Sequence, residues 1–148
     1  MRSCHPVSIV QPAQFDPGTA QTPGSERLSA IAADRGVASA LWGGLFIVAP
    51  GVSTGIHHHG EQDTIAYVLE GKCLVRWGER GEFSATAAVG DFIHVPAWLP
   101  HMEINSSDDR RFVWVVVRST ARPIVVNLPD DYWDQKTRPE ESINMMIL

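Results

Sequence analysis

The sequence has few cysteines, no long apolar run and no excess of basic residues. Cys4 and Cys73 are its only cysteines and lie far apart, so both thiols are expected to be reduced, with Cys73 as a small core side chain. No segment is long and apolar enough to cross a bilayer, and the first residues show no signal-peptide core, which predicts a cytoplasmic protein with no membrane partner. The formal net charge of −5 argues against a nucleic-acid partner, because phosphate binding requires a basic patch.

Helical periodicity is also lacking. Residues 1–26 contain four prolines, which disfavour a helix, and only residues 7–10 are apolar enough to predict a short strand there. From residue 41 onward, short runs rich in Val, Ile, Phe and Trp alternate with Gly, Pro, Asn or Asp. Strands are predicted near residues 41–48, 53–59, 64–70, 72–77, 82–88, 91–95, 100–105, 111–118 and 123–126. This pattern predicts an all-β fold, either a sandwich or a barrel.

The strand pattern also divides the chain into three parts. We expect an N-terminal arm with a short strand over residues 1–40, a barrel over 41–128 and a C-terminal tail over 129–148. Residues 129–133 are expected to begin a single helical turn, and the polar residues after them to form a loose end.

Five of the six histidines lie between positions 57 and 101. His57 and His59 stand two residues apart, and on a strand such side chains share a face, so both imidazoles are expected to point into one cavity. Imidazole is the commonest metal ligand in proteins, so this pair forms half of a chelate. On its own, the segment 57–59 fits a metal site and a surface histidine-rich turn equally well.

Two blocks around the histidines carry a stronger signal. They read Gly51-x5-His57-x-His59-x11-Gly71 and Gly90-x5-Pro96-x4-His101-x3-Asn105. In order and spacing they resemble the two conserved motifs of the cupin superfamily. The resemblance implies an all-β cupin fold, the double-stranded β-helix or jelly-roll barrel. It also implies one divalent metal ion per chain on His57, His59 and His101, and a structural role for Asn105.

Two positions depart from the cupin pattern. The glycine of the second motif is Trp98 here, and Thr64, a poor ligand, stands where the family usually has a metal-binding glutamate. Gln62 and His94 are the candidates to replace it, since either reaches the cavity if its strand presents it inward. The alternatives are a solvated turn residue for Gln62 and a hydrogen-bonded or water-facing strand histidine for His94. The predicted metal ligands are therefore His57, His59, Gln62, His94 and His101, with His94 and His101 as the catalytic residues.

Two neighbours of these candidates have expected supporting roles. His58 alternates away from His57 and His59, so it is expected at the rim of the cavity. Asp63 either orients a ligand imidazole, as carboxylates near metal sites commonly do, or belongs to a turn beside Gly60.

The expected ligand set contains imidazoles and an amide but no carboxylate. Neutral ligands leave the full charge on the ion, which favours Lewis-acid chemistry over the oxygen chemistry of iron sites with two histidines and a carboxylate. Zinc is the expected ion, with Fe²⁺ or Ni²⁺ as alternatives.

Several further segments are similar to those of cupin-type aromatic polyketide cyclases of the resistomycin kind, which act in antibiotic biosynthesis. These segments are residues 22–24, 57–61, 67–71, 76–78, 90–92 and 116–119. The resemblance implies aldol-type ring closure and dehydration of a poly-β-ketone, free or carrier-bound, in the barrel. The candidates to wall such a substrate are Trp42, Trp77, Phe92, Trp98 and Trp114, and the alternative for each of them is an ordinary core side chain. The alternatives are a cupin dioxygenase or other oxidoreductase acting on a small aromatic or ketone, and a metal-containing ligand-binding or isomerase-like protein.

The N-terminal arm also predicts an assembly. It carries the apolar residues Val7, Ile9, Val10 and Phe15. An arm of this kind is expected to cover an open sheet edge, on its own subunit or on a partner, and the expected product is a symmetric homodimer.

Overall fold

The computed structural model describes residues 6–18, 24–36 and 39–137. Within these ranges, ten strands and one short α-helix follow one another, with 3-10 turns at Pro12–Gln14 and Ala33–Arg35. The strands are β1 (Ser25–Ile31), β2 (Trp42–Val48), β3 (His57–His58), β4 (Thr64–Glu70), β5 (Lys72–Trp77), β6 (Phe83–Ala88), β7 (Phe92–Val95), β8 (His101–Ile104), β9 (Phe112–Arg118) and β10 (Val126–Asn127). The helix is α1 (Tyr132–Thr137).

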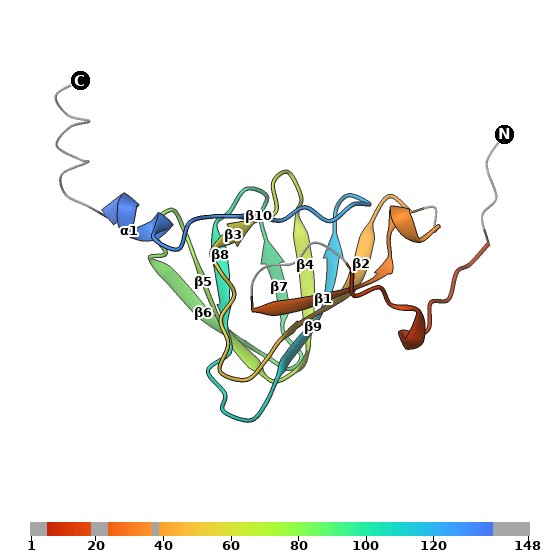
Figure 1. Cartoon of the computed structure of the whole chain (residues 1–148), viewed down its shortest axis with the longest axis horizontal. Helices are drawn as coiled ribbons and strands as arrows, with labels where there is room; N and C mark the ends of the chain where they lie inside the picture. The colour runs from red at the N-terminus through yellow and green to blue at the C-terminus, as the bar shows by residue number, and fades with distance from the viewer. Residues whose placement is uncertain (1–5, 19–23, 37–38, 138–148) are drawn as a thin grey trace, which may run out of the picture.

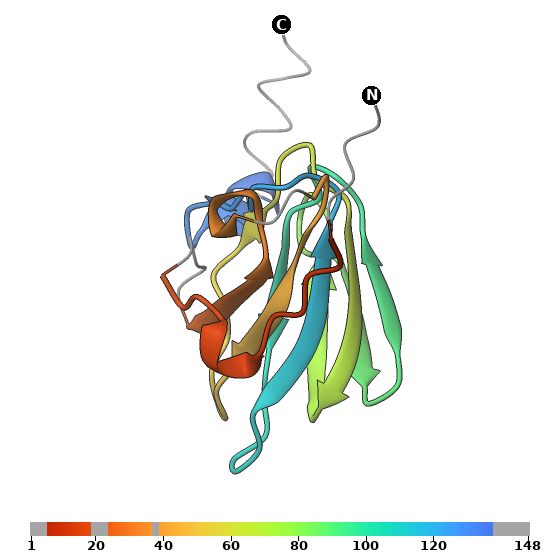
Figure 2. The same cartoon turned by 90° about the vertical axis from the view of Figure 1, so that its right-hand side faces the viewer.

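The strands form two antiparallel sheets that face each other (Figures 1 and 2). One sheet has the order β1-β2-β9-β4-β7 and the other has the order β10-β3-β8-β5-β6. Alternate side chains of β2 and β4 are buried between the sheets, which is the period expected of strands with one buried face. Strand β9 pairs with both β2 and β4, as its apolar run predicts for a central strand. The all-β jelly-roll prediction is confirmed.

The N-terminal strand differs from its predicted place. Residues 7–10 form no strand, whereas β1 lies further along and pairs with β2. The buried positions of β1 carry the polar residues Arg27 and Ser29, whereas a usual core strand has apolar residues at its buried positions. The indole N–H of Trp42 donates to the Ser29 hydroxyl at 2.8 Å, which satisfies this buried polar group.

The arm covers a sheet edge within its own chain. The backbone N–H groups of Asp16 and Ser29 each donate to the other residue's carbonyl oxygen at 2.9 Å, so residue 16 lies alongside β1. Val7 and Ile9 remain largely exposed. In this arrangement the arm protects β1 without a partner subunit.

The C-terminal segment packs on the second sheet before it leaves the described region. Trp133 in α1 is buried, and its indole N–H donates to the carbonyl oxygen of Gly78 at 2.9 Å. The guanidinium of Arg76 lies 4.6 Å from the centre of the same ring. The expected helical turn is present, beginning at Tyr132. The polar residues after 133 were expected to be loose, but 134–137 continue this helix, and 138–148 lie outside the described residues.

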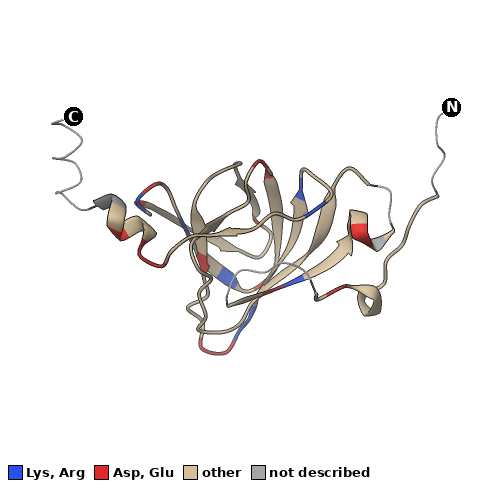
Figure 3. Cartoon of the chain, turned by 45° about the horizontal axis from the view of Figure 1, so that its top comes forward, with Lys and Arg blue, Asp and Glu red and all other residues tan. Residues whose placement is uncertain are grey.

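The described basic residues do not gather on one element of the fold. Figure 3 shows the basic residues spread over several strands instead of collected on one element. No helix in the described ranges is both long and apolar enough to span a membrane. Cys73 is buried, and burial raises the pKa of its thiol to about 12, which fits a core side chain; Cys4 lies outside the described residues.

Candidate metal centre

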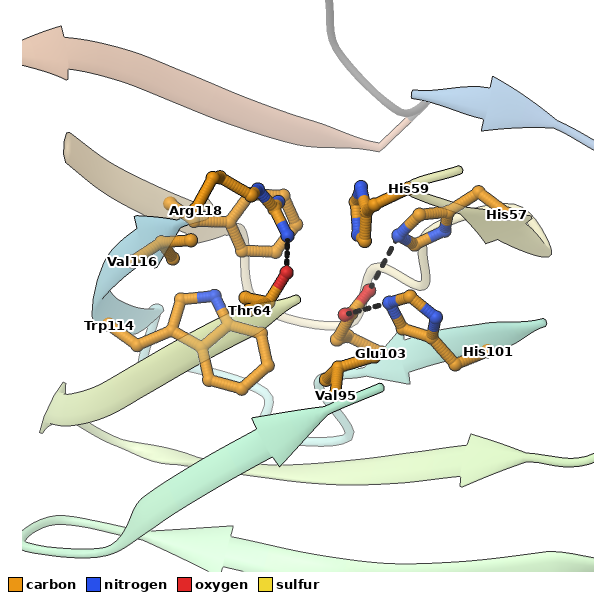
Figure 4. A pocket seen from close by; sticks show the side chains of 10 residues that line it. His57, His59, Thr64, Val95, His101, Glu103, Trp114, Val116 and Arg118 are labelled. Carbon is orange, nitrogen blue, oxygen red and sulfur yellow. Dashed lines mark hydrogen bonds and ion pairs between the residues drawn. The ribbon is translucent and has the colours of Figure 1, made fainter. Parts of the chain in front are cut away.

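Three histidines meet between the two sheets. His57 lies on β3 and His101 begins β8, and the two are direct partners in the antiparallel pairing of these strands. His59 follows β3 and points to the same place (Figure 4). The ring centres of His57 and His101 are 4.3 Å apart, and that of His59 is 5.0 Å from each. All three are buried, and one ligand nitrogen from each lies within 4.8 Å of the others. We call these residues the histidine cluster.

The tautomer of each ring is fixed by a backbone carbonyl. A carbonyl oxygen only accepts, so an Nδ1 atom that faces one must carry the proton, which leaves Nε2 with its lone pair. The acceptors are the carbonyl oxygens of Gly55 for His57 at 2.9 Å, Ile124 for His59 at 2.9 Å, and Leu99 for His101 at 2.8 Å. Three lone pairs that face one another are repulsive until a cation lies between them. The side chains present therefore fit a metal ion.

Burial keeps the imidazoles of His57 and His59 uncharged. It lowers the pKa of His57 to about 4, with repulsion from His101 as a further cause, and it lowers the pKa of His59 as well. Metal binding requires neutral imidazole, so the ligands are prepared for an ion at neutral pH.

The same shifts predict how the metal-free protein responds to acid. Folded His57 binds its proton near pH 4, whereas an unfolded histidine binds it near the ordinary pKa of about 6.5. Between these values the unfolded state holds more protons, so the free energy of unfolding should fall as pH drops from about 6.5 to about 4. Urea unfolding of protein treated with a chelator, followed across this range, checks the prediction. A free energy of unfolding that is flat or rises towards pH 4 contradicts it.

Glu103 adds a carboxylate that the sequence analysis missed. It is buried on β8, with one carboxylate oxygen 3.4 Å from Nε2 of His101 and the other 3.7 Å from Nε2 of His57. The hydroxyl of Thr54 donates to the carboxylate at 3.0 Å. The signal was present, since His101 and Glu103 stand two residues apart on one strand, as His57 and His59 do. A carboxylate therefore lies beside the clustered imidazoles, where the sequence analysis expected none.

The charge of Glu103 requires a positive partner. Burial raises the pKa of this carboxyl, but the neighbouring His57 and His101 and the hydrogen bond from the Thr54 hydroxyl outweigh burial and hold the pKa at about 2. His57 is itself neutral at neutral pH because burial lowers its pKa. Arg118, which lines the same cavity, supplies one positive charge, and a cation within the cluster would supply another directly beside the carboxylate.

Gln62 is not brought to the histidine cluster. Its side chain is fully buried but bonds a loop, where Nε2 donates to the Thr120 hydroxyl at 2.5 Å and to the Arg122 carbonyl oxygen at 2.6 Å. The backbone N–H of Ile124 donates to its Oε1 at 2.9 Å. Because the carbonyl of Ile124 holds His59, Gln62 acts on the cluster by positioning that loop and not as a ligand in this arrangement.

His94 is also separated from the cluster. It lies on β7 beside Ile65 of β4, on the outer face of the sheet, with 60% of its side chain exposed. Its Nε2 lies 3.0 Å from a carboxylate oxygen of Asp63. One of the two alternatives for Asp63 was that it orients a ligand imidazole. Asp63 does bond an imidazole, but this is the imidazole of His94 and not one of the three clustered histidines.

An apolar cavity connects His94 to the cluster. It has a volume of about 290 Å³, measured as the space open to the centre of a water molecule, and His101 and His94 both border it. The other lining residues are Val75, Trp77, Ile93, Val95, Pro96 and Leu99. By the same measure, the cavity inside the histidine cluster has only about 10 Å³.

Trp98 stands where the second cupin motif has glycine, and its backbone adopts the left-handed conformation that favours glycine. Its φ is 65°, it is the one described non-glycine residue with positive φ, and 64% of its surface is exposed. Its N–H donates to the carbonyl oxygen of Gly60 at 2.8 Å, which ties the loop before β8 to the turn after β3. A side chain in this region costs about 1–2 kcal/mol.

Replacing Trp98 should therefore stabilise the fold. Trp98→Gly is expected to raise the free energy of unfolding by about 0.5–1 kcal/mol, because relief of the strain exceeds the extra entropy of an unfolded glycine. Trp98→Ala is the matched control, since it also removes the indole ring but keeps the Cβ atom. Urea unfolding compares the two, and an alanine variant as stable as the glycine variant contradicts the explanation.

Comparison with known proteins places this arrangement in a family. A sequence profile of the cupin domain family matches residues 44–118, about half of the chain, and this stretch includes the whole histidine cluster. The chain belongs to the cupin domain family. Asn105 has the structural role expected in a cupin, since its buried amide nitrogen donates to the carbonyl oxygens of Val48, Ala49 and Arg110.

Individual cupins similar to this chain differ in their activities. Gentisate 1,2 dioxygenase 1 of Aquipseudomonas alcaligenes is 32% identical over 97 residues, which cover 64% of this chain and 24% of that protein. This cupin therefore spans about a quarter of that relative's length. The polyketide cyclase RemF of Streptomyces resistomycificus has a similar fold, with a TM-score of 0.66 and 23% identity over 92% of this chain and 96% of that one. Oxalate decarboxylase of Bacillus subtilis is similar at a TM-score of 0.62 and 21% identity, over 85% of this chain and 32% of that one. These likenesses agree on the fold.

Proposed function

We propose that this cupin is a metal-dependent enzyme whose ion is held by His57, His59 and His101, with Glu103 as a fourth ligand. Imidazole and carboxylate ligands together suit zinc, and Fe²⁺ or Ni²⁺ are the alternatives. When bound, the ion supplies Lewis-acid polarisation of a substrate oxygen. Gln62 and the carbonyls of Gly55, Leu99 and Ile124 keep the imidazoles in the tautomer that such an ion requires.

We further propose that the reaction is aldol-type ring closure of a poly-β-ketone followed by loss of water. The observation that carries this proposal is one apolar cavity bordered both by His101 of the cluster and by His94, whose imidazole pairs with Asp63. When Nε2–H of His94 donates to Asp63, its Nδ1 has a lone pair that can take a proton from a methylene group. The resulting carbanion attacks a ketone carbon, the new alkoxide is protonated, and water leaves. No electron acceptor is consumed.

The volumes of the two cavities support one position for the substrate. The space within the histidine cluster holds an ion and little else, so the body of a polyketide must lie in the apolar cavity, at about 290 Å³. Of the aromatic residues expected to wall the substrate, Trp77 lines this cavity and Trp114 lines the smaller one. Trp42 is a core residue, whereas Phe92 and Trp98 are exposed.

A cupin dioxygenase is the second candidate, and Glu103 is the observation that favours it. A carboxylate beside two or more histidines is the ligand type of non-haem iron oxygenases, so its presence weakens the argument against oxygen chemistry. The similarity to part of a gentisate dioxygenase points the same way.

An oxygen test separates the two candidates. The metal-free protein is loaded with zinc alone or with Fe²⁺ alone and given a poly-β-ketone made in place by a minimal polyketide synthase, under argon and in air. The cyclase proposal expects equal yields of cyclised product under argon and in air with zinc. Product that forms only with iron and oxygen supports the dioxygenase and overturns the cyclase.

We also propose that the protein is a homodimer, formed through the outer face of the first sheet. That face exposes Ile65, Tyr67 and Leu69 on β4, Phe92 on β7 and Val117 on β9. An apolar sheet face of this kind is unusual on a monomer. Light scattering at micromolar concentration should give a dimer for the wild type and a monomer for Phe92→Glu. Phe83→Glu, an exposed residue of the other sheet, is the control and should stay dimeric. A monomeric wild type contradicts the proposal.

A further inference from the structure

The wall opposite the histidine cluster carries a buried guanidinium and a buried indole. Arg118 and Trp114 both lie on β9, and each is 3% exposed. Both line the same small cavity as the cluster. Figure 4 shows them beside Thr64, on the side of the cavity away from His57 and His101.

Two nitrogen atoms of this wall are unpaired. Among the described residues, Nε of Arg118 and Nε1 of Trp114 are buried donors with no hydrogen-bond acceptor. Another nitrogen of the guanidinium, Nη1, donates to the Thr64 hydroxyl, which fixes the orientation of the group. Buried donors are nearly always satisfied, so two unpaired N–H groups on the wall of one cavity indicate a missing acceptor.

The charge of the cavity identifies the kind of acceptor. Burial lowers the pKa of Arg118 to about 9, with repulsion from Arg27 as a further cause, so the guanidinium is still charged at neutral pH. Together with a divalent ion in the cluster, its positive charge exceeds the single negative charge of Glu103. An excess of buried positive charge is unfavourable unless an anion neutralises it.

The size of the cavity limits that anion. A space of about 10 Å³ for the centre of a water molecule admits about one small atom. The acceptor is therefore a single oxygen of a larger molecule whose remainder lies outside, or a very small anion.

We propose that Arg118 and Trp114 form a subsite for one anionic oxygen of the ligand, from a carboxylate or an enolate. Nε–H of Arg118 and Nε1–H of Trp114 donate to this oxygen from the wall opposite the histidine cluster. The subsite makes the enzyme selective for acidic or enolised ligands over neutral ketones and amides. This inference rests on the metal centre proposed above. It adds that the ligand group bound next to that centre is negatively charged.

Nuclear magnetic resonance of the zinc-loaded full-length protein tests the subsite without turnover. The indole N–H resonance of Trp114 is assigned by its loss in Trp114→Phe, and acetate, acetylacetone and neutral acetamide are then titrated in. We expect the resonance to shift with acetate or acetylacetone and to stay in place with acetamide at equal concentration. Tighter binding of acetate identifies a carboxylate as the preferred group, and tighter binding of acetylacetone identifies an enolate.

Variants measure the two donors separately. Trp114→Phe keeps the ring and removes only the N–H, and Arg118→Gln removes the charge; each should weaken acetate binding by about 10-fold or more at equal zinc content. Trp98→Phe is the matched control, since the exposed Trp98 borders neither cavity, and its acetate affinity should equal that of the wild type.

The outcomes distinguish the subsite from the metal centre. Zinc content is measured on the same samples, and full zinc content with an unmoved Trp114 resonance overturns the subsite alone. Equal acetate affinity in the wild type and Trp114→Phe does the same, and this comparison decides the question if Arg118→Gln fails to fold. Absence of zinc from the wild type overturns the metal centre, and the subsite with it.

Discussion

Replacing His57 by alanine should abolish metal binding. The purified wild type is expected to hold about one divalent ion per chain, because its described residues contain a single cluster of three histidines. His57→Ala removes one imidazole from that cluster and leaves Glu103 without its nearest neighbour on β3. We expect zinc occupancy to fall below about one tenth and affinity to fall at least about 100-fold. His101→Ala should behave in the same way. Elemental analysis after dialysis against equal zinc concentrations measures both variants.

The neighbouring histidine provides a matched control. His58 is partly exposed, and its Nδ1 accepts a hydrogen bond from the N–H of Gly60 at 3.0 Å, so it takes no part in the cluster. His58→Ala should keep the zinc content of the wild type. A thermal melt gives a second readout, since zinc binds the folded state and should raise the midpoint of the wild type and of His58→Ala but not that of His57→Ala. Full zinc content in both His57→Ala and His101→Ala contradicts the assigned site.

The strands could be predicted wherever apolar residues occupy one face. The predictions for β4 and β5 match the structure because both strands alternate between core and exterior. Strand β1 was missed because its inward side chains are Arg27 and Ser29, whose burial depends on contacts with Trp42 that only the folded chain provides. The segment before β3 was predicted as a longer strand, but it pairs with the sheet only through the bridge of Ser53 to Ile104 before His57.

The candidate site could be predicted only in part, for reasons that differ between residues. His57, His59 and His101 follow from the two motifs. Gln62 was placed on the cavity face by strand alternation, but it precedes β4 in a turn, where alternation does not apply. His94 lies between Ile93 and Val95, and these two apolar residues take the inward positions of β7, so His94 faces outward.

The position of the carboxylate was the most consequential difference. The family pattern drew attention to Thr64, where a glutamate was expected, and the structure instead places a carboxylate on β8 at Glu103. Thr64 does face the cavity, but its hydroxyl accepts a hydrogen bond from Arg118. The positive and negative groups thus stand on opposite walls, an arrangement that depends on pairing between distant strands and could not be inferred from either motif alone.

Replacing His94 by alanine should reduce turnover without removing the metal. If His94 takes the methylene proton, its loss should lower kcat by about 100-fold or more, which is the usual contribution of a general base. Zinc content should be unchanged, because the imidazole is directed to Asp63 outside the histidine cluster. Asp63→Asn keeps His94 but weakens its orientation, and since both side chains are largely exposed the expected loss is smaller, about 10-fold.

Three measurements on His94→Ala decide its role. Single-turnover ring closure gives the rate, elemental analysis gives the zinc content, and added imidazole tests for rescue, because the shortened side chain leaves room for a free base beside the apolar cavity. We expect a slow variant with full zinc content whose rate rises with imidazole concentration. His58→Ala serves as the control and should keep the wild-type rate. Loss of zinc from His94→Ala restores the sequence-based assignment of His94 as a metal ligand. An unchanged rate with full zinc content means that a group other than His94 accepts the methylene proton. The shared cavity of His94 and His101 is then no longer evidence for ring closure.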